Sequence, residues 1–357
     1  MSAWRRVIFV LIAASAVAGC SSIGPASIKR DRTDYSGSMA NSWKEQMLLN
    51  VVKFRYFDPP VFLDVSSVVS SQELYTQGDL TSRIVPDPLT TSTRDYYNLG
   101  VTTRYTDRPT ISYTPVTGDR FINMLLRPIP SQTMFTMIDS GHDAAFIMQL
   151  AVRSINGINN YSLSPARARA EDARFGQVIA AIRRIQQAGA IGTRSVVARK
   201  GTTTWVFFRH DGGRKVEEDI RLVKRLLRLE SRRDEYLITG GPGRKPGEIA
   251  LVTRSMQEIL TELAAGVQVP KEDIVEQRAT SVPAVGLDSA PRPLIRIHAS
   301  SVRPSDAYTA VSYRDHWFWV DDRDLRSKRV FMFLMIFSAL SETRAVPQMP
   351  IVTIPTN

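Results

Sequence analysis

The chain has 357 residues, of which 43% are hydrophobic, and a formal net charge of +11. That length and apolar content suffice for one large domain or two ordinary ones with a buried core. The sequence contains a single cysteine, Cys20, which excludes a fold held together by internal disulfides.

The first twenty residues form a pattern typical of an export signal. Arg5 and Arg6 precede an uncharged apolar run over residues 7–17, which is too short to cross a bilayer as a helix but suits a secretory signal. The run ends in Val17-Ala18-Gly19-Cys20, which resembles the lipobox of bacterial lipoproteins. In that family the cysteine is acylated and becomes the new N-terminus. The alternative interpretation is an ordinary signal peptide or an N-terminal anchor.

The lipobox resemblance implies a mature chain of 338 residues that begins at Cys20 and is held at a membrane by lipid. We expect residues 1–19 to be the signal peptide, 20–36 a polar tether and 37–357 the folded body. In such lipoproteins an Asp directly after the cysteine tends to retain the protein at the inner membrane. Ser21 occupies that position here, which implies a lipid anchor in the outer membrane, facing the periplasm.

The basic excess is confined to the middle of the chain. Residues 160–260 hold 20 Lys and Arg against 11 Asp and Glu, an excess of nine, and the rest of the expected mature chain is balanced. A helix expected near 220–229 carries four basic residues at i, i+3, i+4 and i+7, so they should share one stripe of its surface. They are Arg221, Lys224, Arg225 and Arg228.

This basic stripe predicts a side of the protein that meets an anionic partner. An anionic lipid, an envelope polymer or an acidic protein would fit an exported protein, and nucleic acid is not expected. The alternative is a solvated face, because helices commonly expose Arg and Lys to water.

Short helices and strands alternate in the first half of the expected body. A capping box at Ser42 and Glu45 predicts a helix over 42–57, and residues 70–95, which are polar, should be an excursion. Strands are predicted around 61–66, 99–103, 111–113 and 146–155, with short helices at 121–126 and 134–138. For the run 146–155 the end of a helix is the alternative.

The second half begins with longer helices. Elements are predicted at 175–188 (helix), 195–199 with 202–209 (hairpin), 220–229 (helix), 236–239 and 249–253 (strands), and 255–265 (helix). Residues 267–293 contain four prolines and should be a linker. Strands at 294–299, 308–313 and 316–320 then lead into a helix from Asp324 that is apolar on every side over 330–337.

These elements place the chain in the α+β class, with largely antiparallel strands. The basic middle segment covers about 160–266 and a C-terminal core segment about 294–345. We expect the hairpin bearing Trp317 and Trp319, with the helix after it, to be the most buried part. The order of elements, and blocks such as Ser154-Ile155-Asn156-Gly157 and Tyr313-Arg314-Asp315-His316-Trp317-Phe318, resemble an uncharacterised group of proteobacterial lipoproteins. That resemblance implies no activity.

Two local clusters suggest chemistry but have simpler explanations. The segment Gly240 to Gly247 offers glycine amides and Lys245 to a phosphate, yet Pro246 stands where G-x-x-x-x-G-K-[ST] needs a hydroxyl, so we expect a hairpin loop. Asp321, Asp322 and Asp324 could hold a hard cation, but their position at the start of a helix favours capping of its free amides.

No catalytic residue, metal site or cofactor is predicted. His142, His210 and His298 are scattered, and neither H-E-x-x-H nor G-x-S-x-G occurs. His316 beside Asp315 is the only local group that resembles an acid/base pair. A surface turn is the preferred interpretation, because adjacent residues of a strand face opposite sides.

The sequence therefore favours a lipid-anchored envelope protein that binds a partner as an accessory or structural component. The alternative is a periplasmic hydrolase whose site is dispersed along the chain. A cavity that gathers two or more of four residues would favour the hydrolase. They are Asp107, His142, His316 and Asp321.

Overall fold

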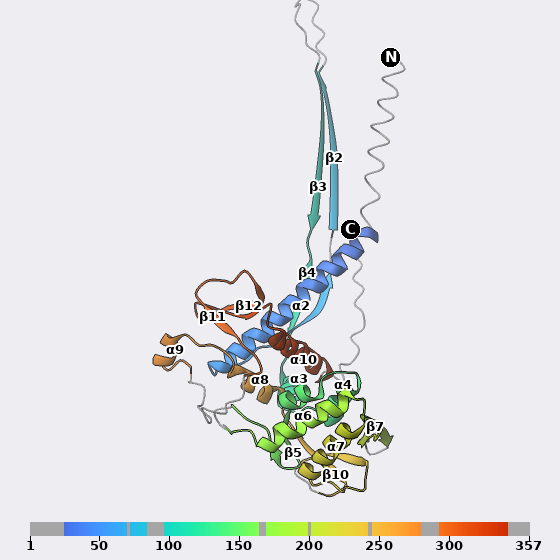
Figure 1. Cartoon of the computed structure of the whole chain (residues 1–357). Coiled ribbons are helices and arrows are strands. Elements are labelled where there is room, and N and C mark those ends of the chain that lie inside the picture. Colours follow the sequence, from blue (N-terminus) through green and yellow to red (C-terminus); the bar gives the residue numbers. More distant parts are fainter. Residues whose placement is uncertain are drawn as a thin grey trace, which may run out of the picture. The chain divides into compact units, whose positions relative to one another are not determined.

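The structure is a computed structural model that describes residues 25–69, 72–83, 96–163, 169–198, 201–241, 245–279 and 293–341 (Figure 1). It divides the chain into two compact units, which we call the ribbon unit (residues 61–117) and the main unit (residues 1–60 and 118–357). The signal segment and Cys20 lie outside the described residues. Helices and mostly antiparallel sheets confirm the predicted α+β class.

The ribbon unit consists of two antiparallel strand pairs. β1 (Leu63–Val69) pairs with β4 (Thr110–Pro115), and β2 (Gln72–Arg83) pairs with β3 (Tyr96–Asp107) along its whole length. The polar excursion expected at 70–95 is therefore wrong for residues 72–83. Every side chain of β2 that the structure describes is exposed, so the strand lacks the buried residues by which strands are usually recognised.

A six-stranded mixed sheet lies in the main unit, in the order β6-β5-β10-β9-β8-β7. Its strands are β5 (Val152–Ile155), β6 (Ile158–Asn159), β7 (Ile191–Ala198), β8 (Gly201–Phe208), β9 (Glu235–Gly240) and β10 (Glu248–Thr253). β7 and β8 form the predicted hairpin, with Val206 and Phe208 on its buried face, while residues 199–200 at its turn lie outside the described part.

The hairpin expected around 240–247 is wrong, because β9 and β10 run parallel. Parallel neighbours normally need a crossover of a dozen or more residues, so two strands separated by a short glycine-rich segment indicated antiparallel pairing. The Leu237 amide instead donates to the Gly247 carbonyl (3.1 Å), which brings the end of the connection back beside the start of β9. Residues 242–244 of this connection lie outside the described part.

Seven helices are described in the main unit between the ribbon unit and the C-terminal strands in sequence. They are α3 (Gly118–Leu125), α4 (Ser131–Asp139), α5 (Ala144–Ala151), α6 (Ala173–Gln187), α7 (Arg214–Leu227), α8 (Met256–Ala264) and α9 (Lys271–Val275). α6 and α7 pack together (Figure 1). A 2.6 Å ion pair between Arg184 and Asp219 joins them. Ser255 and Glu258 form the predicted capping box of α8.

The strand predicted over 146–155 is wrong for its first part, because α5 extends to Ala151 and only Val152–Ile155 are strand. Both elements are buried on more than one side, so apolar residues at every second position did not separate helix from strand. The missed signal is Asp143, whose carboxylate accepts a hydrogen bond from the Ala145 amide (3.0 Å) and caps the helix.

The segment expected to be a linker, 267–293, is partly ordered against the fold. α9 lies within it, and its Asp273 is buried and accepts a hydrogen bond from the Tyr56 hydroxyl (2.6 Å). Burial and this hydrogen bond raise the pKa of Tyr56. Residues 280–292 lie outside the described part.

α2 (Pro25–Arg55) begins well before the helix expected at 42–57, so the described part of the expected tether is helical. Its described side chains before Trp43 are mostly exposed, whereas Met47 and Val51 are buried. The polar composition that predicted a tether is, in its described part, that of an exposed helix. Among the described helices none is both long and apolar enough to cross a bilayer.

The C-terminal part comprises a three-stranded sheet and a helix. β11 (His298–Ser300), β13 (His316–Asp321) and β12 (Ala307–Tyr313) lie in that order, followed by α10 (Leu325–Ser341). The predicted turn is confirmed: Arg314 and Asp315 have φ of 47° and 62°, as a tight hairpin turn requires.

The burial of this hairpin differs from the expectation. Phe318 and Val320 are fully buried, whereas Trp317 and Trp319 are half-buried on the other face of β13. The Trp319 ring stacks on His298 from β11, with 4.6 Å between the ring centroids. The smaller apolar residues thus form the inner face, and the tryptophans cover the outer one.

Candidate functional site

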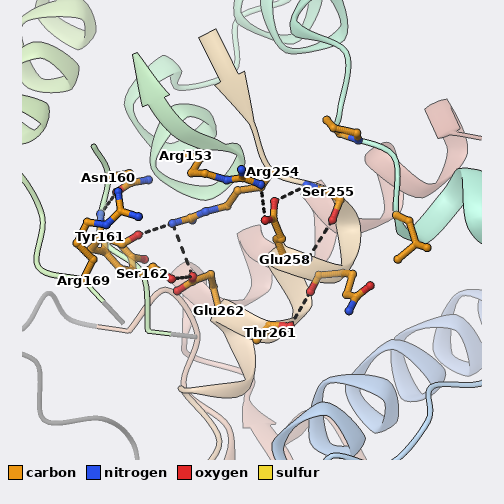
Figure 2. Close-up of a pocket in the computed structure, with 13 residues that line it drawn as sticks. Arg153, Asn160, Tyr161, Ser162, Arg169, Arg254, Ser255, Glu258, Thr261 and Glu262 are labelled. Carbon is orange, nitrogen blue, oxygen red and sulfur yellow. Dashed lines mark hydrogen bonds and ion pairs between the residues drawn. The ribbon is translucent and has the colours of Figure 1, made fainter. Parts of the chain in front are cut away.

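A polar cavity of about 360 Å³ lies beside the N-terminus of α8 (Figure 2). Its walls come from the segment after α3, from β5 and the residues after β6, and from α8 with the residue before its N-cap. Five charged residues line it: Arg153, Arg169, Arg254, Glu258 and Glu262.

Arg254 is the most enclosed charge of this cavity, with a side chain only 3% exposed. Its guanidinium donates hydrogen bonds to the carbonyls of Gln149 (3.2 Å) and Leu150 (3.1 Å) in the last turn of α5, and to that of Tyr161. Carbonyls in the last turn of a helix lack helical partners, and a cation there also meets the negative end of the helix dipole. Arg254 thus holds the end of α5 against the chain after β6.

Glu262 completes this buried arrangement from α8. Its carboxylate accepts hydrogen bonds from the Ser162 hydroxyl (2.5 Å) and the Leu163 amide (2.6 Å), and lies 4.0 Å from the Arg254 guanidinium. Figure 2 shows Arg254 reaching between Tyr161 and Glu262. Burial raises the pKa of the Tyr161 hydroxyl.

The cavity wall nearer the solvent carries a second pair, Arg153 with Glu258, at side-chain exposures of 38% and 29%. Glu258 also accepts a hydrogen bond from the Ser255 amide (3.2 Å) within the capping box. The cavity therefore offers ion-paired walls to a small polar molecule. Its buried charges hold the backbone, and Ser162 has a carboxylate rather than an imidazole as its hydrogen-bond partner.

The predicted basic stripe on α7 is only partly present. Arg221, Arg225 and Arg228 are exposed, but Lys224 is 6% exposed and lies at the inner side of the helix. Its ammonium group forms an ion pair with Asp234 (2.8 Å) and donates to the Ser231 carbonyl (3.3 Å). The i+3 spacing placed Lys224 at the edge of the stripe, where its long side chain turns toward Asp234. Lys224 is therefore removed from the predicted contact surface.

A histidine cluster beside Lys224 was not found by sequence reasoning. His210 is held between two carboxylates, with Nδ1 against Glu217 and Nε2 2.7 Å from Asp234. The hydrogen bond with Asp234 raises the pKa of His210 most, and the one with Glu217 raises it further. Conversely, the hydrogen bonds from Lys224 and, to a smaller extent, from His210 lower the pKa of Asp234. Asp234 precedes β9, so only the packing of β8, α7 and β9 brings these groups together.

The four residues named for a hydrolase do not converge in the described cavities, since none of these is lined by two of them. Asp107 belongs to the ribbon unit. His142 packs edge-on against Phe333 (5.4 Å between centroids), and His316 Nδ1 lies 3.1 Å from the Arg314 carbonyl. The dispersed hydrolase site stays a prediction without a supporting geometry.

Of the acidic cluster before α10, Asp324 caps the helix as predicted, whereas Asp322 forms an ion pair instead. Asp324 accepts hydrogen bonds from the Ser327 amide (3.1 Å) and hydroxyl (2.6 Å), and Asp322 pairs with Lys328 (2.7 Å). Among the described residues, no group of three or more metal-ligating side chains is suited to a metal ion.

A second, apolar hollow of about 520 Å³ lies between α2 and α10. Phe331 and Leu334 of α10 are buried, but Met332 and Met335 are 40% and 48% exposed, so the helix expected to be buried all round has one open face. The charged residues of this hollow are all basic. They are Lys44, Lys328 and Arg329.

Comparison with protein-family models, with curated proteins and with solved structures found no match to this chain. The resemblances to the lipobox and to proteobacterial lipoproteins therefore stay predictions from the sequence.

Proposed function

We propose that the chain is a lipid-anchored protein of the outer membrane that faces the periplasm and binds a partner there. The observation that carries the proposal is the coincidence of Arg5-Arg6, an apolar run, two small residues and the single cysteine, Cys20. The exposed first part of α2 would act as a spacer between the lipid and the packed part of the main unit.

Binding is favoured over hydrolysis by what the described cavities contain. The buried charges at the polar cavity, Arg254 and Glu262, are engaged with backbone groups, and the residues named for a hydrolase lie elsewhere. By contrast, Arg221 and Arg225 on α7 and Arg228 at its C-cap are exposed to solvent. An anionic lipid, an envelope polymer or an acidic protein is the partner class that such a surface suits.

The anchor is tested by labelling cells with radioactive palmitate. The native chain should be cut before Cys20 and labelled, and Cys20→Ala should accumulate as an unlabelled precursor. Cys20→Ala that is still processed and lipid-labelled would contradict the anchor.

The partner surface is tested with the chain from position 20 carrying Cys20→Ser. It should float with anionic vesicles at low salt and be released at high salt, because screening shortens the reach of charges to about 8 Å at physiological ionic strength. Reversal of Arg221, Arg225 and Arg228 to Glu should abolish binding.

A matched control reverses three exposed arginines outside residues 160–260. They are Arg127, Arg303 and Arg323. If this control loses as much binding as the α7 variant, the attraction is a property of net charge and the stripe is only a solvated face.

A further inference from the structure

The β2–β3 register separates the residues of the ribbon into two unlike faces. Successive residues of a strand alternate between faces, so positions of equal parity on each strand share one. One face holds Glu73, Tyr75, Gln77, Asp79, Thr81 and Arg83 of β2, opposite Thr106, Arg104, Thr102, Gly100, Asn98 and Tyr96 of β3. Between the terminal Gln72–Asp107 pair and the tip, the other face holds Leu74, Thr76, Gly78, Leu80 and Ser82, opposite Tyr105, Thr103, Val101, Leu99 and Tyr97.

Of the five charged residues in the two strands, four belong to the first face, and the second has only Asp107, in the terminal pair with Gln72. We call the second face the apolar face. The apolar face is open to solvent where the structure describes its side chains, and Val101 is 68% exposed. A two-stranded hairpin is at best marginally stable in water, so a ribbon of this length calls for a surface that covers its apolar face.

The strands of the ribbon are as long as membrane-spanning strands. On β3 the aromatic positions of the apolar face are Tyr97 and Tyr105, which are eight residues apart and therefore about 26 Å apart along the strand at about 3.3 Å per residue. Membrane-spanning strands are tilted by about 35–45°, which reduces that distance to about 20 Å across the bilayer; they present an apolar band about 25 Å tall and need about 9–11 residues. Both β2 and β3 have twelve residues.

The outer edges of the ribbon add a second requirement. Among the described strands, β2 pairs only with β3, so each has one edge without a neighbour. Proteins protect such edges with proline, β-bulges or charged residues, lysine above all. Neither strand contains a proline or a lysine, their register has no bulge, and all of their charged residues except Asp107 lie on one face. In hydrocarbon an unpaired backbone edge is not tolerated, so a neighbouring strand of equal length must complete it.

We infer that the apolar face of the β2–β3 ribbon enters a lipid bilayer, where its edges pair with the ribbons of further copies of this chain. An identical ribbon supplies strands of the required length and the same segregation of faces. The charged face then lies away from the lipid. The inference goes beyond the proposed function, since it needs neither acylation of Cys20 nor the α7 arginines.

The test uses the absence of other cysteines. The chain from position 20 with Cys20→Ser receives one new cysteine at a time, labelled with an environment-sensitive fluorophore and mixed with phospholipid vesicles. Labels at Val101 or Thr76 should shift to shorter wavelength and be quenched by brominated lipid, whereas labels at Thr102 or Gln77 should not. Equal responses on both faces, or none on either, would overturn the inference.

A charge placed on each face provides the second arm. Val101→Asp should lose the vesicle signal of a label at Thr76, while Thr102→Asp should retain it. Val101 is already solvent-exposed, so its substitution does not disturb a packed core, and the tryptophan fluorescence of the main unit checks folding. Retention of the signal in Val101→Asp would contradict insertion through this face.

Chemical crosslinking of the vesicle-bound protein tests the edges. We expect species of more than one copy in vesicles carrying the native ribbon and only monomer with Val101→Asp. Vesicle-bound protein that crosslinks only as a monomer would overturn pairing between copies. A shift of the fluorophore emission that occurs only with a partner protein, and never with lipid, would assign the apolar face to that protein instead.

Discussion

The main unit and the ribbon unit are held together in different ways. In the main unit Leu334, Ile147 and Ile259 are fully buried by side chains from several elements. No described residue of β1–β4 is buried, and burial resumes only at Phe62 and Val116 at the base of the ribbon. The main unit carries its own core, whereas the described part of the ribbon unit shows regular backbone pairing without one.

This difference indicates where each unit finds its stability. Burial of apolar surface contributes about 25 cal/mol per Å², so the core accounts for most of what holds the main unit. A hydrogen bond that replaces one to water contributes only about 1 kcal/mol net, which leaves an isolated ribbon marginal. The main unit should thus tolerate changes in the ribbon but not in its own core, and the following experiments test that.

The largest effect is expected from Arg254→Ala. It leaves Glu262 buried without its nearby cation and removes the guanidinium donor from the Leu150 carbonyl, whereas the Gln149 carbonyl keeps the Asn160 side-chain amide; we expect a loss of about 3–5 kcal/mol in the free energy of unfolding. Tryptophan fluorescence during urea unfolding reports this, because Trp43, Trp205, Trp317 and Trp319 all belong to the main unit.

The matched control for that experiment is Arg153→Ala, in the same cavity but 38% exposed and paired with Glu258 at the surface. It should cost less than about 1 kcal/mol. Equal losses in both variants would show that Arg254 does not hold the end of α5.

Leu334→Ala in α10 should follow, with a loss of about 2–5 kcal/mol, because it leaves a cavity among fully buried neighbours. Met335→Ala, next to it on the exposed face, should change the unfolding free energy by no more than about 0.5 kcal/mol. Thermal or urea unfolding of the two variants measures the difference. Equal losses of stability in both would place α10 outside the core.

A smaller, pH-dependent effect is expected from His210→Gln. The pKa of His210 is raised in the folded protein by Asp234 and Glu217, so its protonation stabilises the fold. That contribution is fully present below the unfolded pKa of about 6.5 and is lost as the pH rises through the higher folded pKa.

The wild-type protein should therefore exceed the variant in stability by less than about 1 kcal/mol at pH 6, since the side chain of His210 is 44% exposed and screened. Urea unfolding at pH 6 and pH 9 measures the difference, which should shrink at the higher pH. A difference that grows with pH would show that the cluster holds His210 neutral.

The smallest effect on the main unit should come from removing the ribbon. The Val116 amide donates to the Phe62 carbonyl (2.9 Å), so a short Gly-Ser loop can join these residues in place of 63–115. Shortening a connection changes its closure entropy only slowly with length, and the main-unit transition should move by less than about 1 kcal/mol. Loss of cooperative unfolding would show that the two units form one core.

Local features were predictable because their causes lie within a few residues. The capping box of α8, the apolar face of α6 and the turn at Arg314-Asp315 each depend on neighbours along the chain. The charge stripe of α7 was predicted from the same spacing, and three of its four residues are exposed. Helix spacing gave no indication that Lys224 turns inward.

The sequence by itself determined the α+β class, most of the helices, the two antiparallel hairpins and the local excess of basic charge, because these follow from spacing and composition. The tertiary structure decided the parallel pairing of β9 and β10, the helix at 144–151, the buried contacts of Arg254 and the segregation of the ribbon's faces. Each of these features depends on which strand or helix packs against the segment concerned. Local sequence patterns do not specify that packing partner, since the contact joins segments far apart in sequence.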